Sequence, residues 1–407
     1  MVRLSRILRD YDNAGGLNEL ISLWGFVDDH VFLTKAGHVG LVYAVRGVDY
    51  EGLTHQQRQA LVHQVEAGLR MLDDRCRIYQ YVVKRAMPPI VPASCLMPVA
   101  SEAIQRRAAY LNARRHHLSD IRLYLVIVYE APHVARRATS LSRLWKNPRT
   151  AFRGWLSSDA TVRLLESELD QAIATLYHKA QAFEVQVSEC GLRPLPKNDA
   201  FRFFRCVVND DARSTDTVTL AYDTHLDYFV SDCAIECYRD HLVVGDRLVK
   251  VLSMKEPPSH TFASVLRDVY ELPGDLTACL EWQRIPADRM RRDLQARRRH
   301  FFNKRVSLVN YIAPDTKPEE MLTDDSATAT VRQLGDALTE TEVNGHFFGQ
   351  CSLTLVLHGH DARSLQQQAA EARKVFAVHD GLLFDETYNL LNAWLSVIPG
   401  NGAHNVR

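Results

Sequence analysis

The feature that most constrains the fold is the order in which strand-length apolar runs and helical apolar stripes follow one another. Near the start, residues 30–34 and 39–45 predict a hairpin of two short strands. Thr54 is a favourable N-cap, and apolar residues recur at helical spacing after it: Leu61, Val65, Leu69 and Leu72. A strand predicted over residues 76–84 completes a hairpin–helix–strand unit.

A strand, a long helix and another strand are predicted for the rest of the first half. Residues 121–129 form a continuous apolar run, which is typical of a strand buried on both faces. The apolar stripe between Val162 and Phe183 predicts a long helix. Residues 201–208 predict a further strand.

The second half repeats this order. An apolar hairpin is predicted over residues 240–253, and a helix capped by Ser259 follows it. Residues 276–285 predict a strand. A further apolar strand over residues 351–357 leads to a helix that begins at Asp361.

An internal duplication is the interpretation that this repetition favours. Segment 191–208 aligns with segment 381–398 at unchanged spacing. The predicted fold is α+β (mixed α/β), with two related split β-α-β (ferredoxin-like) lobes and helical insertions. The first lobe is predicted over residues 1–210 and the second over residues 211–407. The alternative, that any α+β chain yields such an alignment, stays open at this point.

Two charged insertions of opposite sign interrupt the pattern. Residues 133–153 contain six basic residues and no acidic one, whereas residues 313–345 are predominantly acidic. Insertions of this kind are typical either of surface handles for partners or of solvated loops. The sequence leaves both interpretations open.

A basic helix is predicted over residues 286–305, where arginines are interleaved with His300, Phe301 and Phe302. Such a segment is suited to binding phosphates and stacking on bases. The simpler interpretation is a solvated helix that pairs with the acidic insertion, so protein contact is favoured over nucleic-acid contact. The candidate contact residues of this segment and of the basic insertion are Arg284, Arg291, Arg292, Arg297, Arg298, Arg299, Arg136, Arg137, Arg143 and Lys146.

Catalytic and nucleotide-binding motifs are absent from the sequence. It contains no GxxxxGK[ST] and no GxGxxG, so the usual phosphate-binding loops are missing. It also contains no GxSxG, SxxK or HExxH, which argues against the common nucleophilic and zinc hydrolases. No catalytic or nucleotide-binding residue, and no cofactor for this chain, is therefore predicted.

Two groups of residues are weak candidates for metal ligands. His358, His360 and Asp361 lie together, but Asp361 is also the expected cap of the helix that follows. Cys233 and Cys237 have the wrong spacing for a zinc knuckle, and buried structural cysteines are commoner. No metal site is predicted.

Charge and hydropathy limit the environment of the chain. The 49 basic and 49 acidic residues give zero net charge, which excludes a uniformly basic coat for nucleic acid. The longest apolar runs are strand-length, and the charge-free stretch 87–101 contains four prolines, so no membrane-spanning helix is predicted. Eight scattered cysteines without a CxxC indicate reduced thiols, and hence a cytoplasmic protein that reaches a membrane through a partner.

The last segment resembles a known family. The residues that carry the resemblance are Gly345-His-Phe-Phe-Gly349, the strand 351–357, Gly381, Glu386, Asn389 and 393–401, which ends in Ile398-Pro-Gly-Asn401. Residues 41–47, 246–258 and 298–311 fit the same pattern. Together they resemble the part that precedes the nucleotide-binding domain in the VirB/TrbE/CagE family of type IV secretion ATPases, with the TrbE branch of conjugal transfer proteins nearest.

The resemblance implies a component at the cytoplasmic base of a conjugation apparatus, peripheral to the inner membrane. Members of the family energise pilus assembly and the transfer of DNA or protein, using ATP and magnesium. They work as oligomers, with inner-membrane subunits and other secretion ATPases as partners. Residues 1–407 lack the family's Walker A and Walker B motifs, so they are expected to form its amino-terminal assembly domain, inactive alone. The alternative is a stand-alone nucleic-acid-binding module that uses the arginine-rich segments.

Overall fold

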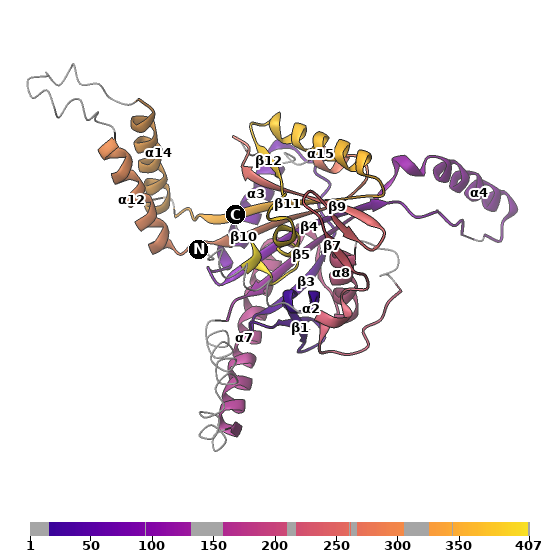
Figure 1. Cartoon of the computed structure of the whole chain (residues 1–407), viewed down its shortest axis with the longest axis horizontal. Helices are drawn as coiled ribbons and strands as arrows, with labels where there is room; N and C mark the ends of the chain where they lie inside the picture. Colours follow the sequence, from indigo (N-terminus) through magenta and orange to yellow (C-terminus); the bar gives the residue numbers. More distant parts are fainter. Residues whose placement is uncertain are drawn as a thin grey trace, which may run out of the picture.

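One large antiparallel sheet organises the described part of the chain (Figure 1). In the computed structural model, residues 16–93, 95–131, 158–209, 217–259, 261, 267–304, 325–343 and 345–405 are described. Within these ranges the sheet has 12 strands, and its main path runs β1-β2-β3-β5-β4-β10-β11-β9-β8-β7. β6 pairs with β3, and β12 pairs with β9, beside this path. The prediction of a mixed α/β fold is confirmed.

The first half contributes six strands. Their bounds are β1 Leu23–Phe26, β2 Val31–Thr34, β3 Val39–Val45, β4 Cys76–Ala86, β5 Ser119–Tyr129 and β6 Leu192–Pro194. The helices of this half are α2 Leu17–Leu20, α3 His55–Met71, α4 Pro98–Ala113, α7 Ser158–Gln186 and α8 Lys197–Asn209. Strands β6, β3, β5 and β4 lie side by side in that order, each antiparallel to the next.

The second half contributes the other six strands. They are β7 Ile235–Cys237, β8 Leu242–Val244, β9 Arg247–Glu256, β10 Asp275–Arg284, β11 Gly349–Gly359 and β12 Leu382–Asp385. Its helices are α10 Leu226–Phe229, α11 Arg267–Glu271, α12 Ala287–Lys304, α14 Asp325–Glu342, α15 Ala362–Ala377 and α16 Leu390–Leu395. Strands β12, β9, β11 and β10 lie in that order, again antiparallel.

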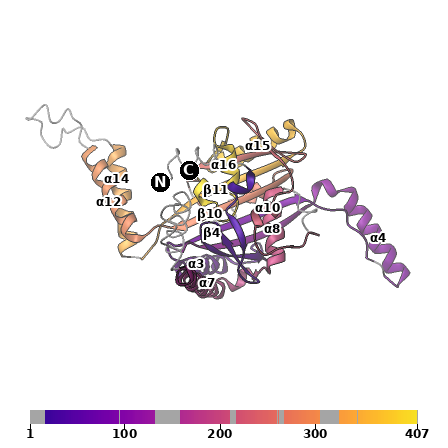
Figure 2. The ribbon, with the colours of Figure 1, turned by 60° about the horizontal axis from the view of Figure 1, so that its bottom comes forward.

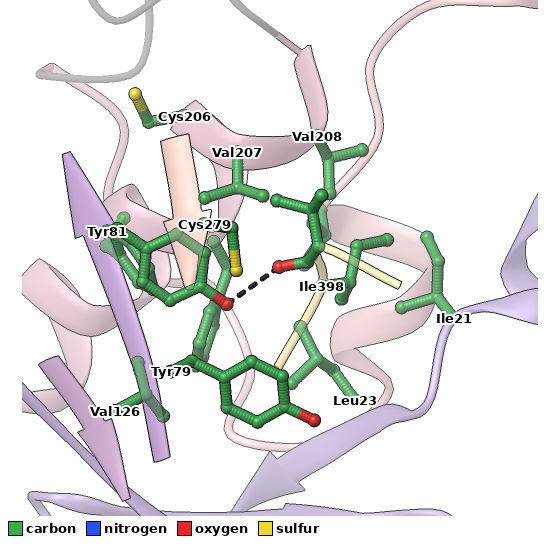
Figure 3. Packing of buried hydrophobic residues seen from close by; sticks show 14 of the residues in the cluster. Ile21, Leu23, Tyr79, Tyr81, Val126, Cys206, Val207, Val208, Cys279 and Ile398 are labelled. Atoms are coloured by element: carbon green, nitrogen blue, oxygen red, sulfur yellow. Dashed lines mark hydrogen bonds between the residues drawn. The ribbon is translucent and has the colours of Figure 1, made fainter. Parts of the chain in front are cut away.

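The two halves join through β4 and β10, which pair from Arg77 opposite Gln283 to Lys84 opposite Leu276. Both faces of the sheet are covered. On one face, α3 and α7 pack on the first half and α15 on the second. On the other face, α8 and α16 share one core with β4, β5, β9 and β10. Figure 3 shows this core where Tyr79, Tyr81 and Ile398 meet.

Two helix caps predicted from the sequence are confirmed. Thr54 caps α3 in a capping box with Gln57, and Asp361 caps α15 by accepting a hydrogen bond of 2.8 Å from the Ser364 N–H. The predicted helix after Ser259 lies mostly outside the described residues, which include only α11 of this region.

The strand predicted over residues 201–208 is wrong, because these residues belong to helix α8. Pro196 opens the helix, and its carbonyl accepts hydrogen bonds of 2.9 Å from the N–H groups of Asp199 and Ala200. Phe201, Phe204 and Val208 recur at helical spacing and are buried, because α8 packs between the sheet and the segment around α10. An eight-residue segment rich in apolar residues does not by its length distinguish a buried strand from a buried helix.

Two structures project from opposite ends of the sheet (Figures 1 and 2). Helix α4 lies between β4 and β5, and helices α12 and α14 lie between β10 and β11. Because β4 and β10 are antiparallel neighbours, the two connections leave from opposite ends. None of the helices in the described ranges combines the length and apolar content that a membrane crossing requires.

Candidate assembly surfaces

The helical hairpin of α12 and α14 places the predicted basic helix against the predicted acidic insertion. Leu294 of α12 and Ala327 of α14 are buried along the seam between the two helices. The Arg291 guanidinium donates hydrogen bonds of 2.9 and 2.6 Å to the Glu342 carboxylate. The predicted pairing of a solvated basic helix with the acidic insertion is therefore confirmed.

The base of this hairpin is fixed to the sheet by aromatic contacts. Phe347 packs edge-on against Trp282 with ring centroids 6.0 Å apart. The Arg284 guanidinium lies 4.8 Å from the centroid of the Phe347 ring, and Arg70 of α3 lies 5.9 Å from it. Arg284 is half-buried and makes a cation–π contact with Phe347 that helps to hold the base of the hairpin on the sheet.

The other predicted contact residues differ in their surroundings. Arg292 donates a hydrogen bond of 3.2 Å to the Asp288 carbonyl and is exposed, as are Arg297, Arg298 and Arg299. The exposed triplet 297–299 lies in the half of α12 that is remote from the sheet. Arg136, Arg137, Arg143 and Lys146, with the whole basic insertion 133–153, lie outside the described residues.

The arm that carries α4 is a surface that the sequence reasoning missed. It is fixed internally, because the Asn112 side chain exchanges hydrogen bonds of 2.8 and 2.9 Å with the backbone of Ile90. Yet Leu96, Met97 and Val99 are exposed at its far end. The available signal was the charge-free stretch 87–101, a proline-rich segment with several apolar residues.

Buried cations anchor this arm where it leaves the sheet. The Lys84 ammonium donates a hydrogen bond of 2.8 Å to the Tyr270 carbonyl, and burial lowers its pKa although Asp275 lies nearby. The Arg85 guanidinium donates hydrogen bonds of 2.8 Å to the Leu276 carbonyl and 3.0 Å to the Thr277 hydroxyl. Both cations thus join the end of β4 to the second half.

The motif Ile398-Pro-Gly-Asn401 ties the end of the second half to the start of the first. Buried Asn401 accepts a hydrogen bond of 2.8 Å from the Ser22 N–H and donates one of 2.9 Å to the Leu20 carbonyl. Nearby, the Tyr81 hydroxyl donates to the Val397 carbonyl at 2.7 Å (Figure 3). The motif is therefore structural.

The metal candidates do not come together. His358 is buried beside the Thr277 hydroxyl, whereas His360 is exposed and Asp361 caps α15. Within the described ranges, no three His, Cys, Asp or Glu side chains are placed to hold a metal ion. The expectation that Cys233 and Cys237 are buried structural cysteines is wrong, because Cys233 is only half-buried and Cys237 is exposed.

Comparison with known proteins shows what the chain resembles. Residues 30–137, from β2 through β5, match the family model described as type IV secretion system ATPase VirB4/TrbE, N-terminal domain. The chain is 22% identical to the conjugal transfer protein TrbE of Rhizobium radiobacter over 409 residues, covering 98% of this chain and 48% of that protein. It is 20% identical to the type IV secretion system protein virB4 of Bartonella quintana (strain Toulouse) over 385 residues, covering 94% of this chain and 46% of that protein.

The resemblance to the VirB4/TrbE type IV secretion ATPases, inferred from the sequence, is thereby confirmed. The chain spans about half the length of the curated relatives it matches.

Proposed function

We propose that residues 1–407 act as a non-catalytic assembly domain of a conjugative type IV secretion ATPase. The observation that carries this proposal is the pair of rigidly based projections at opposite ends of one sheet. The projections extend from a fixed scaffold and expose surface that does not contribute to the hydrophobic core. Such surface is typical of contact sites for other proteins. In this proposal the contacts are with inner-membrane subunits of the conjugation complex, other secretion ATPases and further copies of the chain, at the periphery of the inner membrane.

Hydrolysis of ATP is assigned to no residue of this chain. The sequence contains neither the glycine-rich loop nor the following lysine that hold a triphosphate in P-loop enzymes. We expect titration of magnesium-ATP into residues 1–407 in a calorimeter to give no saturable heat. A stoichiometric binding curve would refute the non-catalytic assignment.

We also propose that the two halves are duplicated ferredoxin-like lobes, divided near residue 210. The matching strand orders β6-β3-β5-β4 and β12-β9-β11-β10 support this, as does the equivalent position of the two projections within them. Hydrogen exchange tests the boundary. Two groups of amides with distinct opening free energies, separated at the β4–β10 seam, are expected. A single cooperative unit would argue against separate lobes.

A second candidate function is nucleic-acid binding by the exposed end of α12. Arg297, Arg298 and Arg299 are exposed there, and such a cluster is suited to phosphate contacts. This function predicts DNA affinity that falls steeply with salt and is lost when the triplet becomes alanine. A matched control replaces Arg363, Arg373 and Lys374 of α15, which lies on the main body. Equal DNA binding by all three proteins would exclude this candidate.

A further inference from the structure

The far end of the α4 arm, which we call the arm tip, comprises residues Cys95–Val99 and is apolar and exposed. Leu96 is fully exposed, Val99 is 81% exposed and Met97 is 68% exposed. Monomeric soluble proteins expose single apolar residues commonly, but three neighbouring aliphatic side chains at the end of a projection mark a contact site. No charged residue occurs between Met87 and Ser101.

Behind the arm tip, the charge of the arm is positive. Residues 87–118 contain four arginines, Arg106, Arg107, Arg114 and Arg115, against the single acid Glu102. Arg106 donates a hydrogen bond of 2.6 Å to Glu102, whereas Arg107 and Arg115 are exposed. From Val99 to Arg106 the helix rises about 10 Å, since each residue adds ~1.5 Å. The first arginines therefore lie about 10 Å behind the apolar end, which is close to the depth that interfacial segments reach in a lipid bilayer.

We propose that the arm tip inserts directly into the interfacial layer of a lipid bilayer that carries anionic headgroups. Apolar side chains of interfacial segments enter the headgroup and acyl boundary to a depth of roughly 5–10 Å. At that depth Arg106 and Arg107 reach the anionic headgroups, where basic side chains are attracted. The chain then meets lipid directly, in addition to the protein contacts of the proposed function.

A protein groove fits the arm tip less well than lipid does. A specific protein interface covers on the order of 800 Å² of each partner and is enriched in aromatic side chains. The arm tip offers one narrow turn of aliphatic side chains, with no aromatic residue between Cys95 and Val99. Fluid acyl chains adapt to such a narrow apolar end, whereas a protein partner must enclose it.

The arm is built to hold its tip away from the body. Lys84 and Arg85 are buried at its base, and Asn112 fixes the outgoing loop to the returning helix through Ile90. α4 is 16 residues long, which corresponds to about 24 Å of helix. The tip thus extends beyond the sheet, as Figures 1 and 2 show from two directions.

The test is co-sedimentation of the 407-residue chain with vesicles of phosphatidylcholine alone and with vesicles that contain 30% phosphatidylglycerol, a composition of roughly the anionic content that attracts basic segments. We expect binding to the anionic vesicles that weakens with salt, and at least tenfold weaker binding to the neutral ones. The pair Leu96→Asp and Val99→Asp should lower binding at least roughly tenfold, because exposed aspartates oppose insertion.

A matched control carries the same change at two exposed valines elsewhere, Val185→Asp and Val378→Asp, and should bind as the parent does. Neutralising Arg107 to glutamine should weaken binding roughly fivefold, on anionic vesicles only. Arg115→Gln, at the base of the arm beyond the end of α4, should have little effect because the surface potential falls off within a Debye length. Equal thermal midpoints of all variants show that folding is unaffected.

A fluorescent label on Cys95 reports insertion directly. Cys237 and Cys351, the other exposed thiols, are changed to serine, and the Cys95→Ser protein gives the background. A blue shift on anionic vesicles is expected. No shift, no vesicle binding, or equal loss in the control valine variants would overturn the proposal. So would loss of a protein partner, rather than of lipid, when the tip is changed.

Discussion

Replacement of Asn401 by alanine tests the role of the motif that carries the family resemblance. The side chain is 2% exposed and makes two hydrogen bonds to backbone groups nearly 380 residues away in the sequence, at Ser22 and Leu20. Asn401→Ala leaves a backbone donor and a backbone acceptor without their partner. Each unsatisfied group costs about 1–2 kcal/mol, so the free energy of unfolding should fall by about 2–4 kcal/mol.

Chemical denaturation monitored by circular dichroism measures this loss. Asn198→Ala is the matched control, since its side chain accepts one hydrogen bond of 3.0 Å from the Leu220 N–H at an exposed site. The control should cost about 1 kcal/mol or less. If Asn401→Ala costs no more than the control, the motif does not tie the two ends together, and the reasoning is refuted.

Three further changes probe packing, charge and pH. Gly40→Ala should lose about 1–3 kcal/mol by denaturation, because a Cβ there would lie 2.3 Å from the Phe32 ring; unchanged stability would contradict this close approach. Arg291→Ala should cost under ~1 kcal/mol, since its pair with Glu342 is half exposed, and a large loss of sheet stability would contradict it. Burial lowers the pKa of His38, so the unfolded chain binds more protons and stability should fall as pH drops below about 6.5. His38→Gln should flatten that dependence in melts at pH 7 and 5.

Local signals predicted the fold well wherever one face of an element is exposed. The hairpin of β2 and β3, the caps Thr54 and Asp361, and the helix α12 follow from turn residues and periodicity. Helix α8 was missed although Phe201, Phe204 and Val208 recur at helical spacing, because so short a segment, rich in aromatic and β-branched residues, also fits a strand. Which of the two forms depends on packing against partners distant in the sequence.

Prediction of the candidate surfaces from local sequence is limited in the same way. The pairing of α12 with α14 was predictable because opposite charges mark both helices, as Arg291 and Glu342 illustrate. The exposure of the arm tip was not predictable from the sequence, because aliphatic residues such as Leu96 and Val99 also occur in buried loops. Only the geometry of the β4–β5 connection reveals that they are exposed.

Binding to the membrane complex tests the central claim most directly. Labelled residues 1–407 would be titrated into the detergent-solubilised inner-membrane complex of a conjugation apparatus from cells that lack the TrbE-type protein. The assembly role predicts saturable binding that weakens when Arg297, Arg298 and Arg299 are changed. Binding should stay unchanged with Leu96→Asp and Val99→Asp, whose proposed contact is with lipid, and with Val185→Asp and Val378→Asp. No saturable binding by the folded chain would contradict the assembly role.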